Sequence, residues 1–331
     1  GLQVRGDDIG NGLFHTRERV RLATTRQDDI LQLSGGPWVE ARVRWNPWLR
    51  TVAGLRADGY WADVESNLPE NSGTEDDLLL SPKLSLLLGP WRRTEVYANF
   101  GYGFHSNDAR GATIRVDPRT GEAVGRVPPL VRAEGMDLGV RTEVVPGLNL
   151  ALTGFVLDLA SELVFVGDAG GTEASRPSRR AGVELQSFWR PRPWLSVDAD
   201  LALSKGRFRD GDPAGEHIPG SIERAVSAGV SVEDLGPVFG SLRLRYFGPR
   251  PLIEDDSIRS SSSTLVNARL GYAFRPGLRL ALEVFNLLDE DSNDIEYFYE
   301  SRLPGEDEPV EDVHFHPHEP RALRLVAEWR Y

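Results

Sequence analysis

The segment Leu323-Arg324-Leu325-Val326-Ala327-Glu328-Trp329-Arg330-Tyr331 ends the chain with a regular alternation of two kinds of side chain. Its odd positions are apolar or aromatic, and its even positions are mostly charged. Because successive side chains of a β-strand point to opposite faces, the segment predicts a strand with one apolar and one polar face. The same period of two recurs upstream, in residues 95–104, 195–204, 266–275 and 278–284. The chain is therefore predicted to be all-β.

The predicted connections alternate between short and long. Proline and glycine, which fix or permit the dihedrals of a chain reversal, predict tight turns at Asn46-Pro47, Gly89-Pro90, Pro146-Gly147, Pro191-Arg192-Pro193, Gly236-Pro237 and Pro276-Gly277. Polar stretches predict long loops at 65–77, 106–128, 167–176, 209–218, 249–262 and 289–320. Short turns at one end and long loops at the other are typical of an antiparallel transmembrane β-barrel, here with about fourteen strands. Residues 1–331 are predicted to form one such domain.

A soluble β-sandwich shows the same alternation, because it buries its apolar face. Predicted strands of roughly 10–15 residues, however, exceed the usual globular length of about five to six. Aromatic residues also lie near the predicted strand ends, where membrane barrels carry girdles: Trp38, Trp45, Trp48, Trp91, Trp194, Trp329 and Tyr331. The membrane barrel is therefore the preferred interpretation, with a soluble β-rich binding module as an alternative.

Composition narrows the class further. The formal net charge of −12 disfavours nucleic acid as a partner. The absence of cysteine suits a compartment in which free thiols are a liability. No run of ~18 apolar residues exists that could form a membrane-spanning helix. The first six residues have neither the basic start nor the apolar core of a secretory signal, which predicts a processed precursor or a fragment.

Several segments, in this order and spacing, resemble the TonB-dependent receptors of the outer membrane. They read GLRADGY at 54–60, LSPKLS at 80–85, EVYANFGYGFHSNDARG at 95–111, RAEGMDLGVR at 132–141 and VFNLLD at 284–289, before the aromatic-ended last strand. The resemblance covers essentially the whole chain. Receptors of this family have barrels of about twenty-two strands. The chain thus resembles the C-terminal portion of such a barrel.

The resemblance implies a location in the outer membrane of a Gram-negative bacterium and a function in energy-coupled uptake of a scarce nutrient. The expected ligand is an iron–siderophore or a similar metal complex. The expected partners are outer-membrane lipid, lipopolysaccharide and the TonB coupling protein. The family's N-terminal plug domain and the short TonB box that binds the coupling protein are absent from these residues. The alternative is a passive porin-like or an enzymatic outer-membrane barrel.

Two groups of residues are candidates for ligand binding at the external mouth. His105, Asn107 and Arg110, with Asp108 beside them, follow one predicted strand, where they either face a ligand or brace the loop through hydrogen bonds. His314, His316 and His318 share one side if their segment is extended. Three imidazoles can hold a transition metal, but no spacing defines a fourth ligand, so histidines that line the mouth are the preferred interpretation.

The sequence predicts neither a metal site nor a cofactor. The loop at 289–320 is acidic, but it lacks the Asp-x-Asp-x-Asp-Gly spacing of a calcium loop. The motifs Gly-x-Ser-x-Gly and His-Glu-x-x-His and the phosphate-binding loop do not occur, so an enzyme is not expected. Charged residues on the polar faces of the strands are predicted to be wall residues in contact with water or plug: Arg141, Glu143, Asp198, Asp200, Arg243, Arg245, Arg269 and Glu283.

Overall fold

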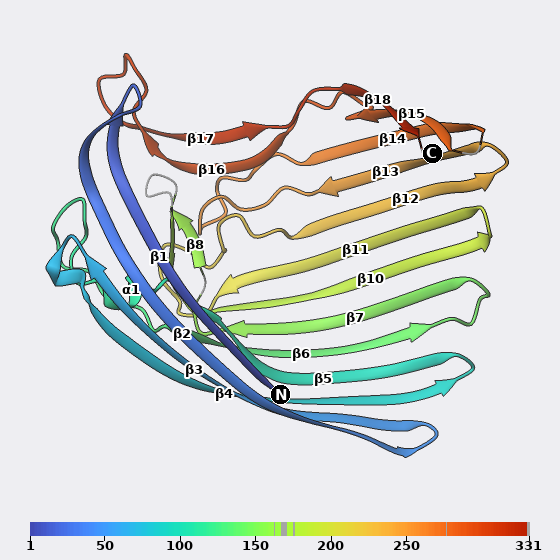
Figure 1. The fold of residues 1–331 in the computed structure, drawn as a ribbon, viewed down its shortest axis with the longest axis horizontal. Helices are drawn as coiled ribbons and strands as arrows, with labels where there is room; N and C mark the ends of the chain where they lie inside the picture. The colour runs from blue at the N-terminus through green and yellow to red at the C-terminus, as the bar shows by residue number, and fades with distance from the viewer. Residues whose placement is uncertain (162, 167–170, 175, 276, 330–331) are drawn as a thin grey trace. The chain divides into compact units, whose positions relative to one another are not determined.

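The computed structural model describes residues 1–331 except for 162, 167–170, 175, 276 and 330–331. Within the described residues, fourteen strands form one sheet in the order β1-β2-β3-β4-β5-β6-β7-β10-β11-β12-β13-β14-β15-β18 (Figure 1). Two separate hairpins, β8–β9 and β16–β17, branch from the connections of this sheet. The predicted all-β, antiparallel architecture with about fourteen strands is confirmed. No plug-like domain occurs among these described residues.

The strands of the sheet are longer than those of most globular proteins. They are β1 (Leu2–Arg17), β2 (Val20–Asn46), β3 (Leu49–Ser66), β4 (Gly73–Trp91), β5 (Thr94–Ser106), β6 (Leu130–Thr142), β7 (Leu148–Leu159), β10 (Ser178–Arg192), β11 (Leu195–Phe208), β12 (Arg224–Leu235), β13 (Val238–Phe247), β14 (Ser263–Arg275), β15 (Leu278–Phe285) and β18 (Ala322–Trp329). The small hairpins are β8 (Leu163–Val166) with β9 (Gly171–Ala174) and β16 (Asn293–Ser301) with β17 (Val310–Pro317).

The chain divides into two compact units, and each is described by itself. The first unit comprises Gly1–Leu86, Asn99–Met136 and Leu157–Pro177. The second unit comprises Leu87–Ala98, Asp137–Val156 and Ser178–Tyr331.

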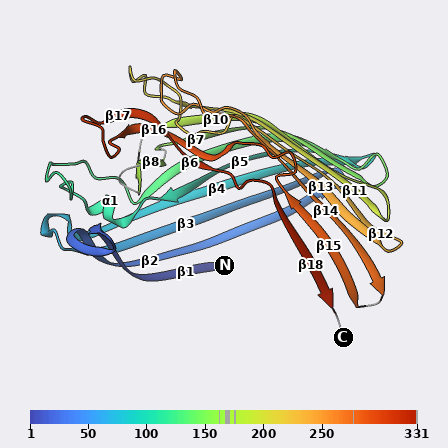
Figure 2. The same cartoon turned by 90° about the horizontal axis from the view of Figure 1, so that it is seen from above.

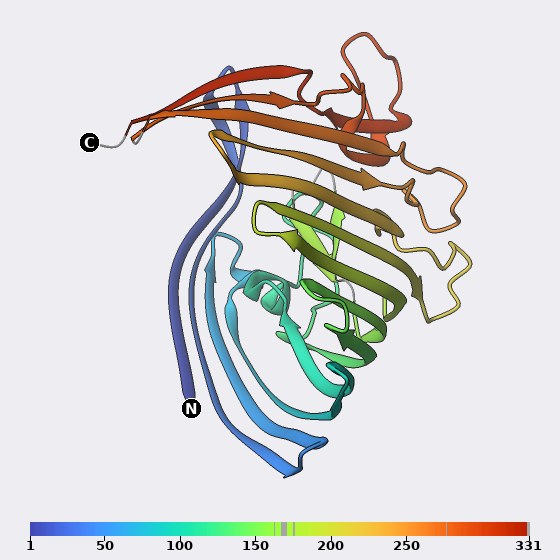
Figure 3. The ribbon, with the colours of Figure 1, turned by 90° about the vertical axis from the view of Figure 1, so that its right-hand side faces the viewer.

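The first unit contains a small apolar core beside its longest strands. Ile30 of β2, Ala62 and Val64 of β3 and Ala109 are buried together, with Tyr60 packed against them. Ala109 begins the single-turn helix α1 (Ala109–Thr113), which contacts β2 and β3 (Figure 3). A one-turn 3-10 helix, η1 (Pro69–Asn71), joins β3 to β4. None of the described helices is long and apolar enough to cross a membrane.

The second unit shows the two faces that the alternation predicts. Leu270 of β14, Leu282 of β15 and Leu325 of β18 lie in one cross-strand row. Leu270 and Leu325 are 67% and 75% exposed, so this apolar row does not pack into a dry interior. In Figure 2, β15 and β18 run side by side to the end of the sheet. A face of exposed leucines is what lipid, and not water, would cover.

Most tight turns lie where they were predicted. The turns β2–β3, β6–β7 and β12–β13 include Pro47, Gly147 and Gly236-Pro237. The β10–β11 turn is at Pro193-Trp194, and in Figure 1 it lies at the same end of the strands as the β12–β13 turn. Pro276, predicted in the β14–β15 turn, lies outside the described residues.

One predicted turn is wrong. Gly89-Pro90 belongs to β4, and the chain reverses at Arg92-Arg93. Both arginines adopt the left-handed backbone conformation, with φ of 49° and 62°. Left-handed backbone at both positions is typical of a two-residue type I′ hairpin, whose twist matches that of the flanking strands. Glu18-Arg19 makes the same kind of turn between β1 and β2, with φ of 51° and 66°.

The predicted loops also need correction. At 65–77 the strands reach Ser66 and restart at Gly73, so this connection is short. The loop at 289–320 contains the hairpin β16–β17. Of the loop at 167–176, residues 167–170 and 175 lie outside the described residues, and 171–174 form β9.

The predicted placement of aromatic residues near strand ends is confirmed at most positions. Trp45, Trp48, Trp91, Trp194 and Trp329 lie at or within two residues of a strand end or turn. Trp38 does not, because it lies inside β2. Tyr331 lies outside the described residues.

Candidate functional site

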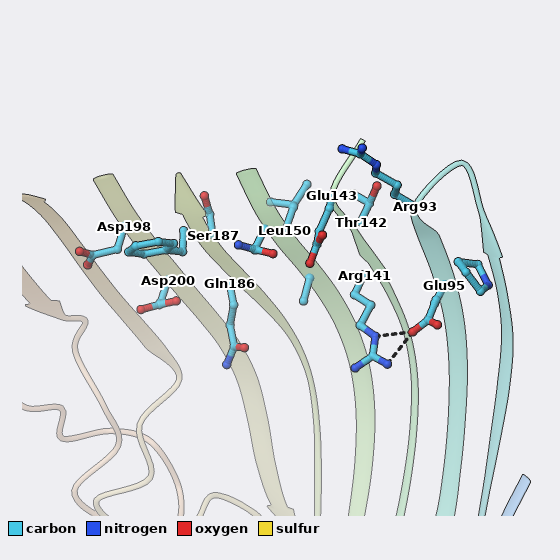
Figure 4. Close-up of a pocket in the computed structure, with 14 residues that line it drawn as sticks. Arg93, Glu95, Arg141, Thr142, Glu143, Leu150, Gln186, Ser187, Asp198 and Asp200 are labelled. Atoms are coloured by element: carbon cyan, nitrogen blue, oxygen red, sulfur yellow. Dashed lines mark hydrogen bonds and ion pairs between the residues drawn. The ribbon is translucent and has the colours of Figure 1, made fainter. Parts of the chain in front are cut away.

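The polar face of the second unit is hollowed near the turn end of its strands. The hollow has a volume of about 850 Å³ (Figure 4). Its lining comes from β4–β5, β6, β7, β10 and β11 and consists of Pro90, Arg93, Glu95, Arg141, Thr142, Glu143, Asn149, Leu150, Ala151, Gln186, Ser187, Phe188, Asp198 and Asp200. Eight of the fourteen lining residues carry a carboxylate, guanidinium or amide group, and apolar side chains such as Leu150 and Phe188 lie between them.

Ion pairs organise this hollow. In Figure 4 the side chains of Arg141 and Glu95 point toward one another, and Arg141 Nε donates to Glu95 Oε2 over 2.8 Å. In the described part of the chain, Glu143 and Asp200 have no ion-pair partner. The hollow therefore offers carboxylates that a basic partner could approach.

A glycine lets one ion pair reach across a whole strand. Asp198 of β11 and Arg243 of β13 both lie opposite Gly229 of β12. Arg243 Nη1 is 3.0 Å from Asp198 Oδ2. A Cβ on Gly229 would lie only 2.8 Å from Asp198 Oδ1, so a side chain there would obstruct the pair. The missing side chain at Gly229 therefore leaves the space in which Asp198 and Arg243 meet.

The ion-paired face continues to the last strand. Glu283 of β15 lies opposite Arg269 of β14 and Arg324 of β18. Arg324 Nη2 is 2.5 Å from Glu283 Oε2, and Arg269 Nε is 3.5 Å from Glu283 Oε1. Charged pairs on one face and exposed leucines on the other are the features of a barrel wall with a wet interior.

In the first unit, the candidate residues after β5 brace their own connection. Asn107 is buried, its Nδ2 donates to Pro128 O over 2.8 Å and its backbone N–H donates to Pro129 O over 2.9 Å. Arg110 Nη2 lies 2.6 Å from Asp108 Oδ2. His105 Nε2 lies 3.0 Å from Ser161 O. The bracing alternative is thus observed for these side chains, while their contact with a ligand stays a prediction.

Asp108 and Arg110 also begin α1. Asp108 is the N-cap, and its Oδ1 accepts from the backbone N–H of Arg110 over 2.9 Å. Burial pushes the pKa of Asp108 upward, but hydrogen bonds from Arg110 and its positive charge outweigh burial and hold that pKa below its usual range. The pKa of Arg110 is raised, chiefly by its hydrogen bond with Asp108. The pair is charged whenever the pH is near neutral.

Sequence reasoning missed the residue that fastens this connection. Asn71, at the end of η1, is fully buried. Its Nδ2 donates to Val116 O over 2.9 Å, and its Oδ1 accepts from the backbone N–H groups of Arg115 and Val116 over 2.9 and 3.0 Å. Only the tertiary fold brings residues 71 and 116 together, so no local pattern could have identified Asn71.

In the second unit, two of the three candidate histidines share one face of the β16–β17 hairpin. His314 lies opposite Tyr297 and His316 lies opposite Ile295. His318 follows the end of β17, and its backbone N–H donates to Ser292 O over 2.9 Å. The described residues contain no group of three or more His, Cys, Asp or Glu arranged to hold a metal. A three-histidine metal site is therefore not formed there.

The base of this hairpin is held by Asn286, within the VFNLLD segment. Asn286 Nδ2 donates to Glu290 O over 3.0 Å and to Glu319 O over 3.2 Å, while its Oδ1 accepts from the Glu290 N–H over 2.9 Å. Asp289 Oδ1 accepts from the Arg321 N–H over 3.1 Å. Asn286 and Asp289 are both left-handed, with φ of 48° and 56°. This segment thus ties the start of the connection to its end.

Together, the tight turns, the exposed apolar face and the ion-paired polar face define the wall of an outer-membrane β-barrel. A family model described as "TonB dependent receptor-like, beta-barrel" matches residues 5–287. The chain belongs to this family, whose members are non-enzymatic transporters in the outer membrane of Gram-negative bacteria. The expected family, fold and location are confirmed, and an enzymatic barrel is excluded.

Solved structures show the same fold at low sequence identity. The chain resembles the closed form of the ferric-catecholate import receptor Fiu from E. coli K12, with a TM-score of 0.73, 16% identity and coverage of 100% of this chain and 50% of that one. It resembles the unliganded ferric citrate transporter FecA, with a TM-score of 0.73, 16% identity and coverage of 99% and 50%. It also resembles the copper transporter OprC, with a TM-score of 0.71, 15% identity and coverage of 99% of this chain and 53% of that one.

The chain thus spans about half the length of each of these receptors. A search of the curated proteins finds no significant match.

Proposed function

We propose that this chain forms part of the wall and outer loops of an energy-coupled receptor that imports a metal complex, with an iron–siderophore as the leading candidate. The observation that carries the proposal is the ion-paired polar face of Glu95, Asp198 and Glu283, opposite exposed leucines, in a chain of this receptor family. A charged, wet inner wall suits a large hydrophilic cargo.

The ligand class rests on the similar structures. Those proteins are named as a ferric-catecholate import receptor, a ferric citrate transporter and a copper transporter. Iron–siderophore complexes are too large for simple diffusion pores, so a receptor must capture them at its outer loops. We assign that capture to the long connections that carry His105, Asn107 and Arg110 in one unit and His314, His316 and His318 in the other.

Energy coupling would come from the partner that the family name implies. In this proposal the TonB protein acts from the periplasm on a plug that fills the barrel. The hollow beside Glu143 and Asp200 would face that plug or the water around it. Outer-membrane phospholipid and lipopolysaccharide would cover the exposed leucines.

The test is uptake by cells that carry or lack the complete gene. A deletion strain is grown under iron limitation with single ferric siderophores or ferric citrate, and uptake of radioactive iron is measured. One complex should lose most of its uptake in the deletion strain and recover it on complementation. Uptake should also vanish in a strain without the coupling protein. Uptake that continued without the coupling protein would instead indicate a passive pore.

A further inference from the structure

The β16–β17 hairpin of the second unit has one face that is rich in aromatic rings. Its register places Ile295, Tyr297 and Tyr299 of β16 on the same side as His314 and His316 of β17. Phe315 lies on the opposite side, because it pairs with Glu296. We call the first side the aromatic face.

A stacked pair forms the centre of the aromatic face. The rings of Tyr299 and His314 are nearly parallel, with centroids 3.8 Å apart and an interplanar angle of 13°. His314 Nε2 is 3.2 Å from Tyr299 O, and because a carbonyl only accepts, Nε2 carries the proton. His316, at the edge of the face, is 74% exposed.

The opposite side of the hairpin is anchored. Glu296 is buried, its Oε2 accepts from the backbone N–H of Ser261 over 2.9 Å and its Oε1 accepts from Asn293 Nδ2 over 2.5 Å. Asn286 and Asp289 hold the base of the same connection. A surface that is held before it meets a ligand loses less conformational entropy on binding.

Charge decides which ligands this face would accept. Residues 289–320 contain twelve carboxylic acids and one arginine, Arg302. His316 Nδ1 lies 3.8 Å from Asp294 Oδ2, so the histidine edge is itself beside a carboxylate. An acidic surface repels anions and concentrates cations within about 8 Å at physiological ionic strength.

We propose that the aromatic face, centred on Tyr299 and His314, binds the planar aromatic part of a neutral or positively charged metal complex by ring stacking. This rests on the proposed function and sharpens it, because it excludes the highly anionic complexes as preferred cargo. A flat, π-bonded ligand extends the Tyr299–His314 stack, and a positive ligand is further stabilised by the ring faces and the carboxylates.

Two probes of opposite charge test the proposal on the complete receptor purified in detergent. They are tris(1,10-phenanthroline)iron(II), a planar-ligand cation, and tris(catecholato)ferrate(III), an anion. Binding is measured by quenching of tryptophan fluorescence at two salt concentrations. The cation should bind at least about tenfold tighter than the anion. The higher salt concentration should weaken binding of the cation, because it screens the charges of the carboxylates. Tighter binding of the anion would overturn the proposal.

Variants locate the site. Tyr299→Ala should weaken cation binding about three- to tenfold, the range expected for loss of one aromatic contact. Tyr299→Phe keeps the ring and should bind like the parent. Phe315→Ala is the matched control, since Phe315 is a 60% exposed aromatic residue of the same hairpin on the other side, and it should leave binding unchanged. Equal effects of Tyr299→Ala and Phe315→Ala would contradict the assignment.

The uptake experiment separates this inference from the proposed function. If Tyr299→Ala leaves both probe binding and iron uptake intact while gene deletion abolishes uptake, the aromatic face is not the ligand site and the receptor function stands. If deletion leaves uptake of every metal complex unchanged but Tyr299 still controls cation binding, the site stands and the metal-uptake function falls.

Discussion

Two outer connections, one in each unit, are fastened in the same way. In residues 107–129 of the first unit the fastener is Asn71, and in residues 289–320 of the second it is Asn286. Each asparagine is buried, and each uses both its amide donor and its carbonyl acceptor on backbone groups of the connection. Backbone N–H and C=O groups that leave the sheet lose their partners in the neighbouring strand and still need hydrogen bonds when they are buried. In both connections the side-chain amide of the asparagine supplies these hydrogen bonds.

What differs is the surface that each connection presents. The first places Ala109 and Ala112 of α1 in the interior and pairs its charges, as in Asp108 with Arg110 and Glu75 with Arg126. The second exposes Phe315 and His316 and gathers carboxylates. The first connection is thus internally paired, whereas the second leaves aromatic and acidic side chains exposed.

The largest expected effect is at Asn286. Asn286→Ala removes three hydrogen bonds and puts a Cβ-bearing residue without a polar side chain at a φ of 48°. At about 1 kcal/mol for each bond and about 1 kcal/mol for the left-handed backbone, the base of the hairpin should lose about 4 kcal/mol. This loss of stability is measured as faster hydrogen exchange of the Glu290 amide in the purified receptor.

Asn286→Gly separates the two contributions, because glycine accepts the left-handed backbone but makes none of the bonds. It should recover about 1 kcal/mol relative to alanine. If glycine and alanine behave alike, backbone strain contributes nothing at this position.

Asn71→Ala should come next. It leaves the N–H groups of Arg115 and Val116 and the carbonyl of Val116 without a partner, which costs about 3 kcal/mol, or roughly a hundredfold in the local opening equilibrium. Amide exchange at residues 115 and 116 reports it. Asn71→Asp keeps the acceptor and should lose less. Unchanged protection in the alanine variant would mean that Asn71 does not fasten this connection.

Acid should loosen the first connection at Asp108, the N-cap of α1. Because the pKa of Asp108 in the folded protein is lowered below 3.8, its contribution is present above that pH and is lost as the pH falls through the lowered value. The amides of Gly111 and Ala112, which donate to Asp108 O, should exchange faster there after correction for intrinsic rates. Asp108→Asn should abolish this acid-dependent step.

The smallest effect is expected on the wall. Glu283→Gln removes charge from the pairs with Arg324 and Arg269, but the Arg324 side chain is 62% exposed and solvent screens it. The loss should stay below about 1 kcal/mol, seen as a shift of a few degrees in the temperature at which the folded barrel unfolds on a gel. A much larger shift would mean that the wall depends on single ion pairs.

Period-two alternation, a local property, determined the all-β class, the two faces of the strands and the approximate strand number. It also placed charged residues such as Arg141 and Glu283 on the polar face of the strands, although it did not identify their ion-pair partners. Most turns were predictable for the same reason, since proline and glycine act on their own dihedrals. The turn at Arg92-Arg93 was not predictable, because arginine has no preference for the left-handed backbone that both residues adopt.

Tertiary structure alone decided the partners. Asp198 pairs with Arg243 across Gly229, Asn71 reaches Val116, and Tyr299 stacks on His314. Each of these contacts depends on strand register or on two segments that meet only after folding. Residue type and spacing specify which way a side chain points, whereas long-range backbone pairing specifies what it meets.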